Sequence, residues 1–392
     1  MRTLFVHGKI YDSDAREFRP GMLMIDGNRI ENILPCESPL PVADRTIDLR
    51  GDMLAPGLID VHTHGRAGFD FNTADEDGMR HMAASYLSGG VTTLMPTLAS
   101  ATFDDLCRAA DTITKFSRET DGAVFVGVHL EGRYLNPEKR GAHAPELLAV
   151  PDAGELSLLL SHMPVPCHVS AAFELDTDGS FARTALDHGA TLGLAHTAAT
   201  AEQAKMAFDR GVSAATHLFN AMPPLHHRYP GAACVALTRP EVWTELICDG
   251  LHIAPDMVAL AYACKGDEKL VLITDSMEAT GCADGHYRIA GMDVIVRDGK
   301  AVTVDGAIAG STLSLLDGVR HLAKFCGISF GHALRCATLN PARMVGIDGD
   351  VGSLAVGKRA DMLILSERED DSLVRLKAVI KNGEFIGKSG EE

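Results

Sequence analysis

The stretch Gly57-Leu-Ile-Asp-Val-His-Thr-His-Gly65 is an apolar segment that ends in two histidines one residue apart. Residues i and i+2 of a β-strand point to the same face, so we expect His62 and His64 to lie side by side where a strand ends. Two imidazoles placed in this way can bind one divalent metal ion. The alternative is two unrelated histidines at the edge of a loop, and ligands from other strands decide between these interpretations.

Similar apolar segments recur through the middle of the chain and alternate with helical patterns. The eight candidate strands begin near Leu58, Val91, Val124, His168, Thr191, Ala214, Leu246 and Leu270. Helical patterns lie in the gaps at Asp75–Tyr86, Phe103–Phe116, Ala201–Arg210 and Pro255–Cys264. This alternation indicates parallel strands joined by crossover helices. Eight such units predict an α/β fold with a TIM-like (β/α)8 barrel, although counting alone leaves a doubly wound sheet open.

Both ends of the chain are instead rich in strand and turn patterns. The strand patterns are Thr3–His7, Met22–Asp26, Arg29–Ile33, Ala360–Leu365, Val374–Ile380 and Glu384–Ile386. Turn signals such as Asp26-Gly27-Asn28 separate them. We expect the two ends to meet in one small β-sandwich domain of residues 1–54 and 346–392, which leaves residues 55–345 to the barrel.

Composition limits the class of protein. The net charge of −17 over 392 residues argues against nucleic acid or an anionic membrane as the main partner. Nine cysteines without a Cys-x-x-Cys suit reduced thiols, and the apolar surroundings of Cys167, Cys234, Cys248 and Cys264 predict that these are mostly buried. No signal region and no apolar stretch of the ~18 residues that a membrane span needs is present. We therefore expect a cytoplasmic protein.

Metal-binding side chain types follow six of the eight predicted strands, at the end where barrel enzymes carry their catalytic groups. They are His62 with His64, Glu131, His196, His217, His252 and Asp275. Each alone has an ordinary explanation as a loop carboxylate, a core histidine or a helix cap. Their occurrence at the same end of six strands predicts a metal site.

Glu131, His196 and His217 form a carboxylate-plus-two-imidazole set. Three protein ligands with a position left for water are typical of a catalytic metal site, whereas a structural site is closed. The histidine pair of the first strand can complete a second, adjacent position. Asp275 is then the expected base that takes a proton from the attacking water, with direct metal ligation as its alternative or additional role.

The segment Pro56-Gly-Leu-Ile-Asp-Val-His-Thr-His-Gly65 is typical of a large hydrolase superfamily. The combination of His129-Leu-Glu-Gly132, Thr216-His-Leu-Phe-Asn-Ala-Met222 and His226-His-Arg-Tyr-Pro-Gly231 is far narrower. With these motifs the chain resembles, almost end to end, the N-acetylglucosamine-6-phosphate deacetylase family of the amidohydrolase superfamily. The resemblance implies metal-dependent hydrolysis of N-acetyl-D-glucosamine 6-phosphate to D-glucosamine 6-phosphate and acetate in amino sugar catabolism.

The resemblance also implies roles for individual residues. Glu131, His196 and His217 would hold the metal essential to catalysis, the pair of the first strand would supply a second site, and Asp275 would be the general acid and base. The substrate-binding residues would be Ala142, His143, Asn220, Ala221, Arg228, His252, Ile308, Ala309 and Gly310. Arg228 would reach the active site of the neighbouring subunit in a homodimer. The cofactor would be Zn²⁺ or Fe²⁺, one or two ions per subunit.

The sequence departs from the family's pattern in one place and from many superfamily members in another. Arg133 stands where the family usually has proline after the His-Leu-Glu-Gly motif, and we expect its side chain to point to solvent rather than to extend anion binding. The fourth strand, expected over His168–Glu174, lacks the lysine that bridges two metals in many superfamily members. Glu131 is therefore the expected bridge.

Three other functions stay open at this point. The nearest is deacetylation of N-acetylgalactosamine 6-phosphate, which differs at C4 of the sugar and which the sequence does not separate from the first. A second is another hydrolase of the superfamily, such as a dihydropyrimidinase-like enzyme or an amino-acid deacylase, whose activity would not depend on the 6-phosphate. The third is a non-enzymatic metal-binding or scaffold protein.

Overall fold

The eight predicted strands are present, and they form a barrel. The computed structural model describes residues 1–117, 121–163, 166–367 and 373–386. The barrel strands are β6 (Leu58–Thr63), β9 (Val91–Leu98), β10 (Val124–Phe125) continued by β11 (Val128–Glu131), β12 (Cys167–Ala171), β13 (Thr191–Leu194), β14 (Ala214–Ala215), β15 (Trp243–Ile247) and β16 (Leu270–Ile273). The seventh strand begins at Trp243, three residues before its expected start near Leu246.

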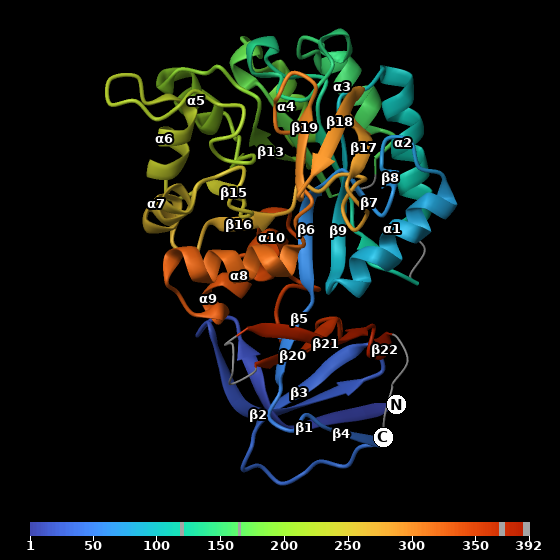
Figure 1. Cartoon of the computed structure of the whole chain (residues 1–392). Helices are drawn as coiled ribbons and strands as arrows, with labels where there is room; N and C mark the ends of the chain where they lie inside the picture. Colours follow the sequence, from blue (N-terminus) through green and yellow to red (C-terminus); the bar gives the residue numbers. More distant parts are fainter. Residues whose placement is uncertain (118–120, 164–165, 368–372, 387–392) are drawn as a thin grey trace.

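These strands pair in parallel, in the order β10-β9-β11-β12-β13-β14-β15-β16, and β6 pairs with β9. A parallel bridge between Thr63 and Ser276 brings the end of β6 beside the segment that follows β16. The sheet is therefore nearly closed into a barrel, with helices around its outside (Figure 1). The predicted (β/α)8 architecture is confirmed, and the doubly wound alternative is excluded.

A helix follows each barrel position. These helices are α1 (Glu76–Ser88), α2 (Phe103–Phe116), α3 (Ala153–Leu160), α4 (Ser180–Asp187), α5 (Ala201–Asp209), α6 (Gly231–Thr238), α7 (Pro255–Lys265) and α8 (Leu315–Cys326). In α2 the Thr102 side chain caps the first turn by accepting from the Asp105 N–H. Its buried residues are Leu106, Ala109, Ala110, Ile113 and Phe116, one apolar stripe that packs against the barrel. Two short helices, α9 (Phe330–Arg335) and α10 (Leu339–Met344), follow α8.

The two ends of the chain meet in a separate mixed sheet below the barrel (Figure 1). Its strands are β1 (Arg2–Asp12), β2 (Glu17–Asp26), β3 (Arg29–Pro35), β4 (Arg45–Asp48), β5 (Met53–Pro56), β20 (Met362–Glu367), β21 (Val374–Lys381) and β22 (Glu384–Ile386). The antiparallel pairing of β5 with β20 joins the N-terminal strands to the C-terminal ones. The predicted small β unit from both termini is confirmed, while the exact domain limits stay a prediction.

A three-stranded antiparallel sheet, which the sequence analysis did not predict, lies between β16 and α8 in the chain. It consists of β17 (Gly285–Ile289), β18 (Met292–Arg297) and β19 (Lys300–Thr303). It stands at the end of the barrel that faces away from the terminal sheet (Figure 1). This is the end at which the barrel strands finish, so the insertion helps to enclose that end.

The cysteines are free thiols among the described residues, as expected, but only some of those predicted to be buried are buried. The described residues contain no disulfide. Cys167 and Cys248 are buried as predicted, and Cys234 is half-buried. Cys264 is exposed, because it lies near the end of α7 on the side turned away from the barrel, so its predicted burial is wrong. Within the described ranges, no helix combines the length and the apolar character that a membrane crossing requires.

Candidate active site

Three of the predicted side chains share one backbone feature, a left-handed residue just after a barrel strand. His196, His217 and Asp275 each stand two residues beyond the end of a short barrel strand. Each has a positive φ, of 42°, 32° and 50° respectively. Residues other than glycine adopt this left-handed backbone at a cost of roughly 1–3 kcal/mol, and such strain concentrates at functional sites. The sharp turns bring all three side chains over the mouth of the barrel.

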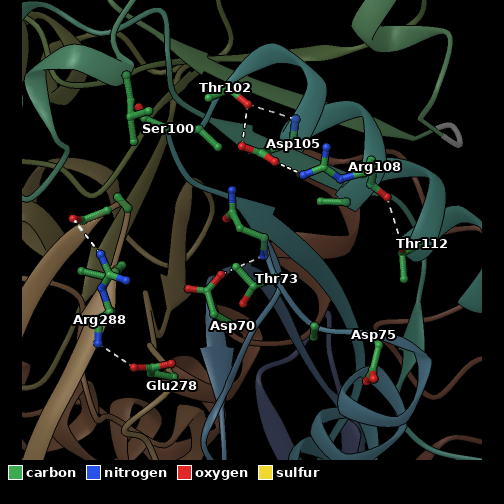
Figure 2. A pocket seen from close by; sticks show the side chains of 18 residues that line it. Asp70, Thr73, Asp75, Ser100, Thr102, Asp105, Arg108, Thr112, Glu278 and Arg288 are labelled. Atoms are coloured by element: carbon green, nitrogen blue, oxygen red, sulfur yellow. Dashed lines mark hydrogen bonds and ion pairs between the residues drawn. The ribbon is translucent and has the colours of Figure 1, made fainter.

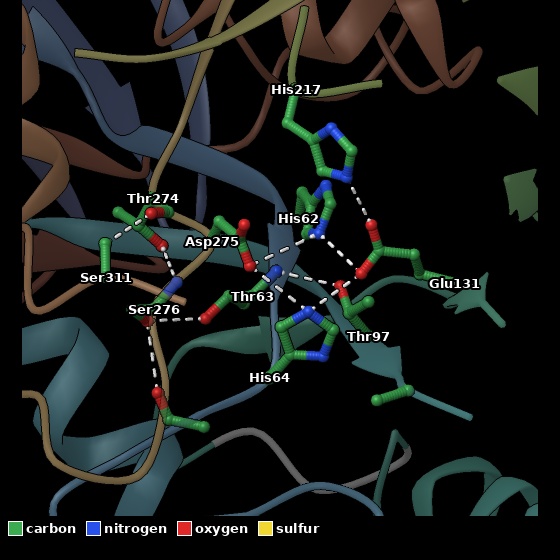
Figure 3. Close-up of polar contacts among 12 residues, drawn as sticks. His62, Thr63, His64, Thr97, Glu131, His217, Thr274, Asp275, Ser276 and Ser311 are labelled. Carbon is green, nitrogen blue, oxygen red and sulfur yellow. Dashed lines mark hydrogen bonds and ion pairs between the residues drawn. The ribbon is translucent and has the colours of Figure 1, made fainter. Parts of the chain in front are cut away.

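Glu131, the last residue of β11, lies among four imidazoles, and Figure 3 shows three of them, those of His62, His64 and His217. Its Oε1 is 2.8 Å from His217 Nε2 and 3.4 Å from His196 Nε2. Its Oε2 is 2.9 Å from His64 Nε2 and 3.2 Å from His62 Nε2. Each carboxylate oxygen thus faces a different histidine pair, which is the arrangement expected of a bridging ligand between two metal positions.

Asp275 lies on the side of the first-strand pair. Its Oδ1 is 3.2 Å from His64 Nε2 and 3.6 Å from His62 Nε2. Burial alone would raise the pKa of Asp275, but the two imidazoles outweigh burial and lower the pKa to about 2. Burial lowers the pKa of His64, yet its hydrogen bonds to Asp275 and Glu131 raise it to about 9. The carboxylate of Asp275 is therefore ionised at neutral pH.

The donor set fits a divalent cation. Among the described residues, two groups of side chains have ligand atoms close enough to hold a metal: His62, His64, Glu131 and Asp275; and Glu131, His143 and His196. The pKa of His62 is raised well above its usual value despite burial, because Glu131 and Asp275 favour its positively charged form. The same two carboxylates would compensate the charge of a metal cation held here. Imidazole and carboxylate ligands suit Zn²⁺ or Fe²⁺.

A cavity of about 390 Å³ opens over these side chains. The predicted residues that line it are His64, Glu131, Ala142, His143, His196, His217, Asn220, Ala221, His252, Asp275, Ile308 and Gly310. His62 and Ala309 are buried behind its wall. The cavity is also lined by residues that the sequence analysis missed: Glu138, Lys139, Gly141 and, from β17, Ile289. The unpredicted insertion therefore supplies part of the wall.

Two side chains that line the cavity are anchored by a neighbour. His143 Nδ1 is 2.8 Å from the Ser100 hydroxyl, which leaves Nε2 for another partner. His252 Nδ1 is 2.7 Å from Asp249 Oδ2. His252 does not end the seventh strand as expected, since β15 stops at Ile247 and His252 lies in the turn that follows. That turn still brings the imidazole to the cavity.

Two arginines differ in how they relate to the cavity. Arg228 lies on an exposed loop, where its Nη1 is 2.8 Å from His227 Nε2, and it does not line the cavity of its own chain. Its predicted role in a neighbouring subunit stays a prediction. The expectation that Arg133 points to solvent is wrong, because its Nε lies 3.2 Å from Glu155 Oε1 and only 18% of the side chain is exposed.

Two further contacts hold imidazoles at Nδ1, the nitrogen that does not face Glu131. His196 Nδ1 is 2.7 Å from the Lys139 carbonyl oxygen, and His62 Nδ1 is 3.2 Å from Glu245 Oε2. Glu245 is fully buried in β15, and the sequence analysis missed it. The available signal was a lone carboxylate within a mostly apolar strand.

Figure 2 shows a larger hollow of about 730 Å³. Ile289 lines both this hollow and the smaller cavity. The polar groups of the larger hollow are mostly engaged with one another: Thr102 and Asp105 form a helix cap, and Arg108 pairs with Asp105. None of the predicted metal ligands lines it. The converging donor groups are thus confined to the smaller cavity.

Comparisons with known proteins agree with this geometry. The pattern of the amidohydrolase family matches residues 53–386. The chain is 36% identical over 340 residues to an N-acetylgalactosamine-6-phosphate deacetylase of Escherichia coli O157:H7, with 86% of this chain and 89% of the relative covered. It is 33% identical over 363 residues to an N-acetylglucosamine-6-phosphate deacetylase of Vibrio furnissii, with 92% and 89% covered.

A solved structure shares the whole architecture. It is a variant of the Mycobacterium smegmatis N-acetyl-D-glucosamine-6-phosphate deacetylase in complex with N-acetyl-D-glucosamine-6-phosphate, at a TM-score of 0.88 and 32% identity. The match covers 98% of each chain. The family pattern covers the barrel and the strands of the terminal sheet from β5 onward, and the solved structure matches the barrel and the terminal sheet together. The chain belongs to the amidohydrolase family.

Proposed function

We propose that this protein is an enzyme that removes the acetyl group from N-acetyl-D-glucosamine 6-phosphate in amino sugar catabolism, with D-glucosamine 6-phosphate and acetate as products. The observation that carries the proposal is the convergence of two histidine pairs and Asp275 on Glu131, beneath a cavity of about 390 Å³. Relatives with this activity in their names match most of the chain.

The metal positions follow from the two oxygens of Glu131. His196 and His217 with Oε1 would hold the metal essential to catalysis, and His62 and His64 with Oε2 would hold a second ion. A divalent cation, Zn²⁺ or Fe²⁺, supplies Lewis acidity there when bound: it polarises an amide carbonyl and lowers the pKa of water. One or two ions per subunit are compatible with these ligands.

Asp275 would move the proton. As an ionised carboxylate at the cavity wall, it accepts a proton from the water that attacks the amide carbon. The C–N bond of the tetrahedral intermediate then breaks, and protonated Asp275 delivers the same proton to the departing amine. His143, whose Nδ1 is engaged by Ser100, is positioned to donate through Nε2 to the sugar or to the developing oxyanion.

The sugar phosphate would lie along the rest of the cavity wall. Asn220 and Ala221, with the backbone of Ile308–Gly310, would contact the sugar, and His252 would serve the phosphate end together with Arg228. A guanidinium suits a phosphate dianion because its N–H groups form a planar fork. Since Arg228 does not reach its own cavity, we propose a homodimer in which it enters the neighbouring one.

We also propose a cytoplasmic location, with which the absence of a disulfide among the described residues agrees.

N-acetylgalactosamine 6-phosphate is the second candidate substrate. A relative named for this activity is 36% identical to the chain, which is more than the 33% of the Vibrio furnissii relative named for the first. The two sugars differ in the configuration of one hydroxyl at C4. The same metal positions and the same Asp275 would serve both.

Turnover with three compounds tests the proposal: both sugar phosphates and unphosphorylated N-acetyl-D-glucosamine, on protein whose metal content has been measured. We expect acetate release from at least the glucosamine derivative and little from the unphosphorylated sugar. Preference for the galactosamine derivative would support the second candidate. Equal rates with and without the phosphate would point to another amidohydrolase, and no turnover in a metal-replete preparation would revive the non-enzymatic alternative.

A further inference from the structure

Glu245 is a carboxylate in the interior of the barrel. It lies in the middle of β15 with no exposed surface. The alternate residues Trp243 and Ile247 belong to the apolar cluster inside the barrel, whereas Leu246 packs in the cluster that includes the outer helices. A buried carboxylate is unfavourable unless hydrogen bonds or positive charge compensate its lost hydration. Its partners should therefore show what it does.

The partners of Glu245 are two of the predicted metal ligands. Its Oε2 is 3.2 Å from His62 Nδ1 and accepts from the His217 backbone N–H at 3.3 Å. Its Oε1 has no hydrogen-bond partner, and His168 Nε2 is 3.8 Å away. Across the described part of the chain, no lysine or arginine pairs with Glu245. One oxygen thus contacts one ligand from each histidine pair.

Both contacts bear on ligand orientation. A proton on His62 Nδ1, donated to Glu245, leaves the Nε2 lone pair directed at the metal position beside Glu131. The bond to the His217 N–H holds the backbone where φ is 32°, and this turn directs His217 Nε2 to within 2.8 Å of Glu131 Oε1. His64 Nδ1 has no hydrogen-bond partner, and His196 is oriented by the backbone of Lys139.

We propose that Glu245 is a positioning residue that orients His62 and His217 together and so sets the affinity of both metal positions. The inference rests on the metal site of the proposed function. Glu245 is not itself a ligand in this proposal, because it meets the Nδ1 edge of His62 while Glu131 meets the Nε2 edge. It acts through the imidazole and the backbone turn.

The test compares Glu245→Gln and Glu245→Leu with the parent protein. Thr244→Val is the matched control, since Thr244 is equally buried on the same strand and its hydroxyl bonds the Lys269 carbonyl. Metal-free proteins are titrated with Zn²⁺ for affinity and with Co²⁺, whose absorption spectrum reports ligand geometry. We expect Glu245→Leu to weaken binding about 10- to 100-fold at both positions. Glu245→Gln, which keeps an acceptor oxygen, should fall between Leu and parent, and the control should bind as the parent does.

Parental affinities and spectra in folded Glu245→Leu would overturn the proposal, and so would weakening at one position alone. If the leucine variant does not fold, the glutamine variant decides by the same criterion. If the parent protein binds only one ion, Glu245 cannot set the affinity of two metal positions, and the proposal fails. A parent that binds no ion contradicts the proposed function itself, whereas two ions bound with the same affinity by the parent and the variants contradict only the inference about Glu245.

Discussion

Asp275 Oδ1 lies 3.2 Å from His64 Nε2, so the expected proton carrier and a ligand of the second metal position are in direct contact. A carboxylate in this place lines the cavity and can accept a proton from water, while the proposed metal ligands are the four histidines and Glu131. Transfer of the proton and retention of the metal are therefore separable, and each can be tested by a different substitution.

Asp275→Asn keeps the size and a carbonyl oxygen but cannot accept the proton. We expect kcat to fall by about 10²- to 10⁴-fold, the usual contribution of a general acid or base. Metal content should stay close to that of the parent, because Glu131 and the four histidines remain. Turnover near the parental rate would remove Asp275 from its proposed role.

The metal count should depend on which histidine pair is removed. For a His62→Ala, His64→Ala double variant we expect one ion per chain where the parent binds two, because Oε1 of Glu131 still faces His196 and His217. For His196→Ala we expect loss of the ion essential to catalysis and with it nearly all turnover. Elemental analysis of dialysed protein checks both, and a parent with one ion would contradict a filled two-metal site.

Arg228→Ala should weaken binding of the sugar phosphate rather than slow the chemistry. Loss of hydrogen bonds to a charged phosphate predicts a KM increase of about 10- to 100-fold with kcat changed little. Tyr229→Ala, on the same exposed loop, is the control for a general effect of the loop.

The proposed exchange of Arg228 between subunits allows a sharper test. Mixing Arg228→Ala subunits with Asp275→Asn subunits creates dimers in which one active site has native Asp275 and receives native Arg228 from its partner. We expect that site to recover the parental KM. If Arg228 acted within its own chain, no mixture would recover it.

Lys265 predicts a dependence of stability on pH that is independent of the metal site. Burial lowers the pKa of this residue to about 8, although its ammonium donates to the Ala236 and Arg239 carbonyls at 3.2 and 2.6 Å. The unfolded chain keeps a pKa near 10.4, so it binds more protons than the folded chain between these values. The contribution of Lys265 to the free energy of unfolding should therefore rise from pH 8 toward pH 10. The buried thiols of Cys167, Cys248 and Cys336, whose pKa values burial raises, have the opposite effect over this range, but they are the same in the parent and in Lys265→Met. Urea unfolding should therefore show that the free energy of unfolding of the parent, relative to that of Lys265→Met, increases from pH 8 to pH 10.

The sequence was sufficient to predict those site residues that directly follow an apolar strand. His196, His217 and Asp275 each follow an apolar strand, so their positions could be inferred without knowledge of the fold's dimensions. Glu245 could not be found in the same way, because it interrupts the apolar pattern. That interruption also explains why the seventh strand was expected to begin at Leu246 instead of Trp243.

The remaining differences arise from contacts distant in sequence. Ala290-Gly291 and Asp298-Gly299 are turn signals, so β17–β19 could have been expected locally, but nothing local indicates that Ile289 would reach the cavity. Arg133 was expected in solvent because its partner, Glu155, is supplied by α3 after a long intervening loop. Such pairings depend on how the loops close over the barrel.

The pairing of β5 with β20 has a consequence for the order of folding. The strand β5 is separated from its partner by the whole barrel in the sequence, and it leads directly into β6, whose end carries His62 and His64. The N-terminal strands can pair with one another early, but during synthesis the pairing of β5 with β20 must wait for β20 to emerge, by which time every barrel strand has been made. The two ends of the chain therefore join in the terminal sheet only after all the proposed metal ligands have been synthesised. This late pairing fixes β5, and through it the start of the first barrel strand.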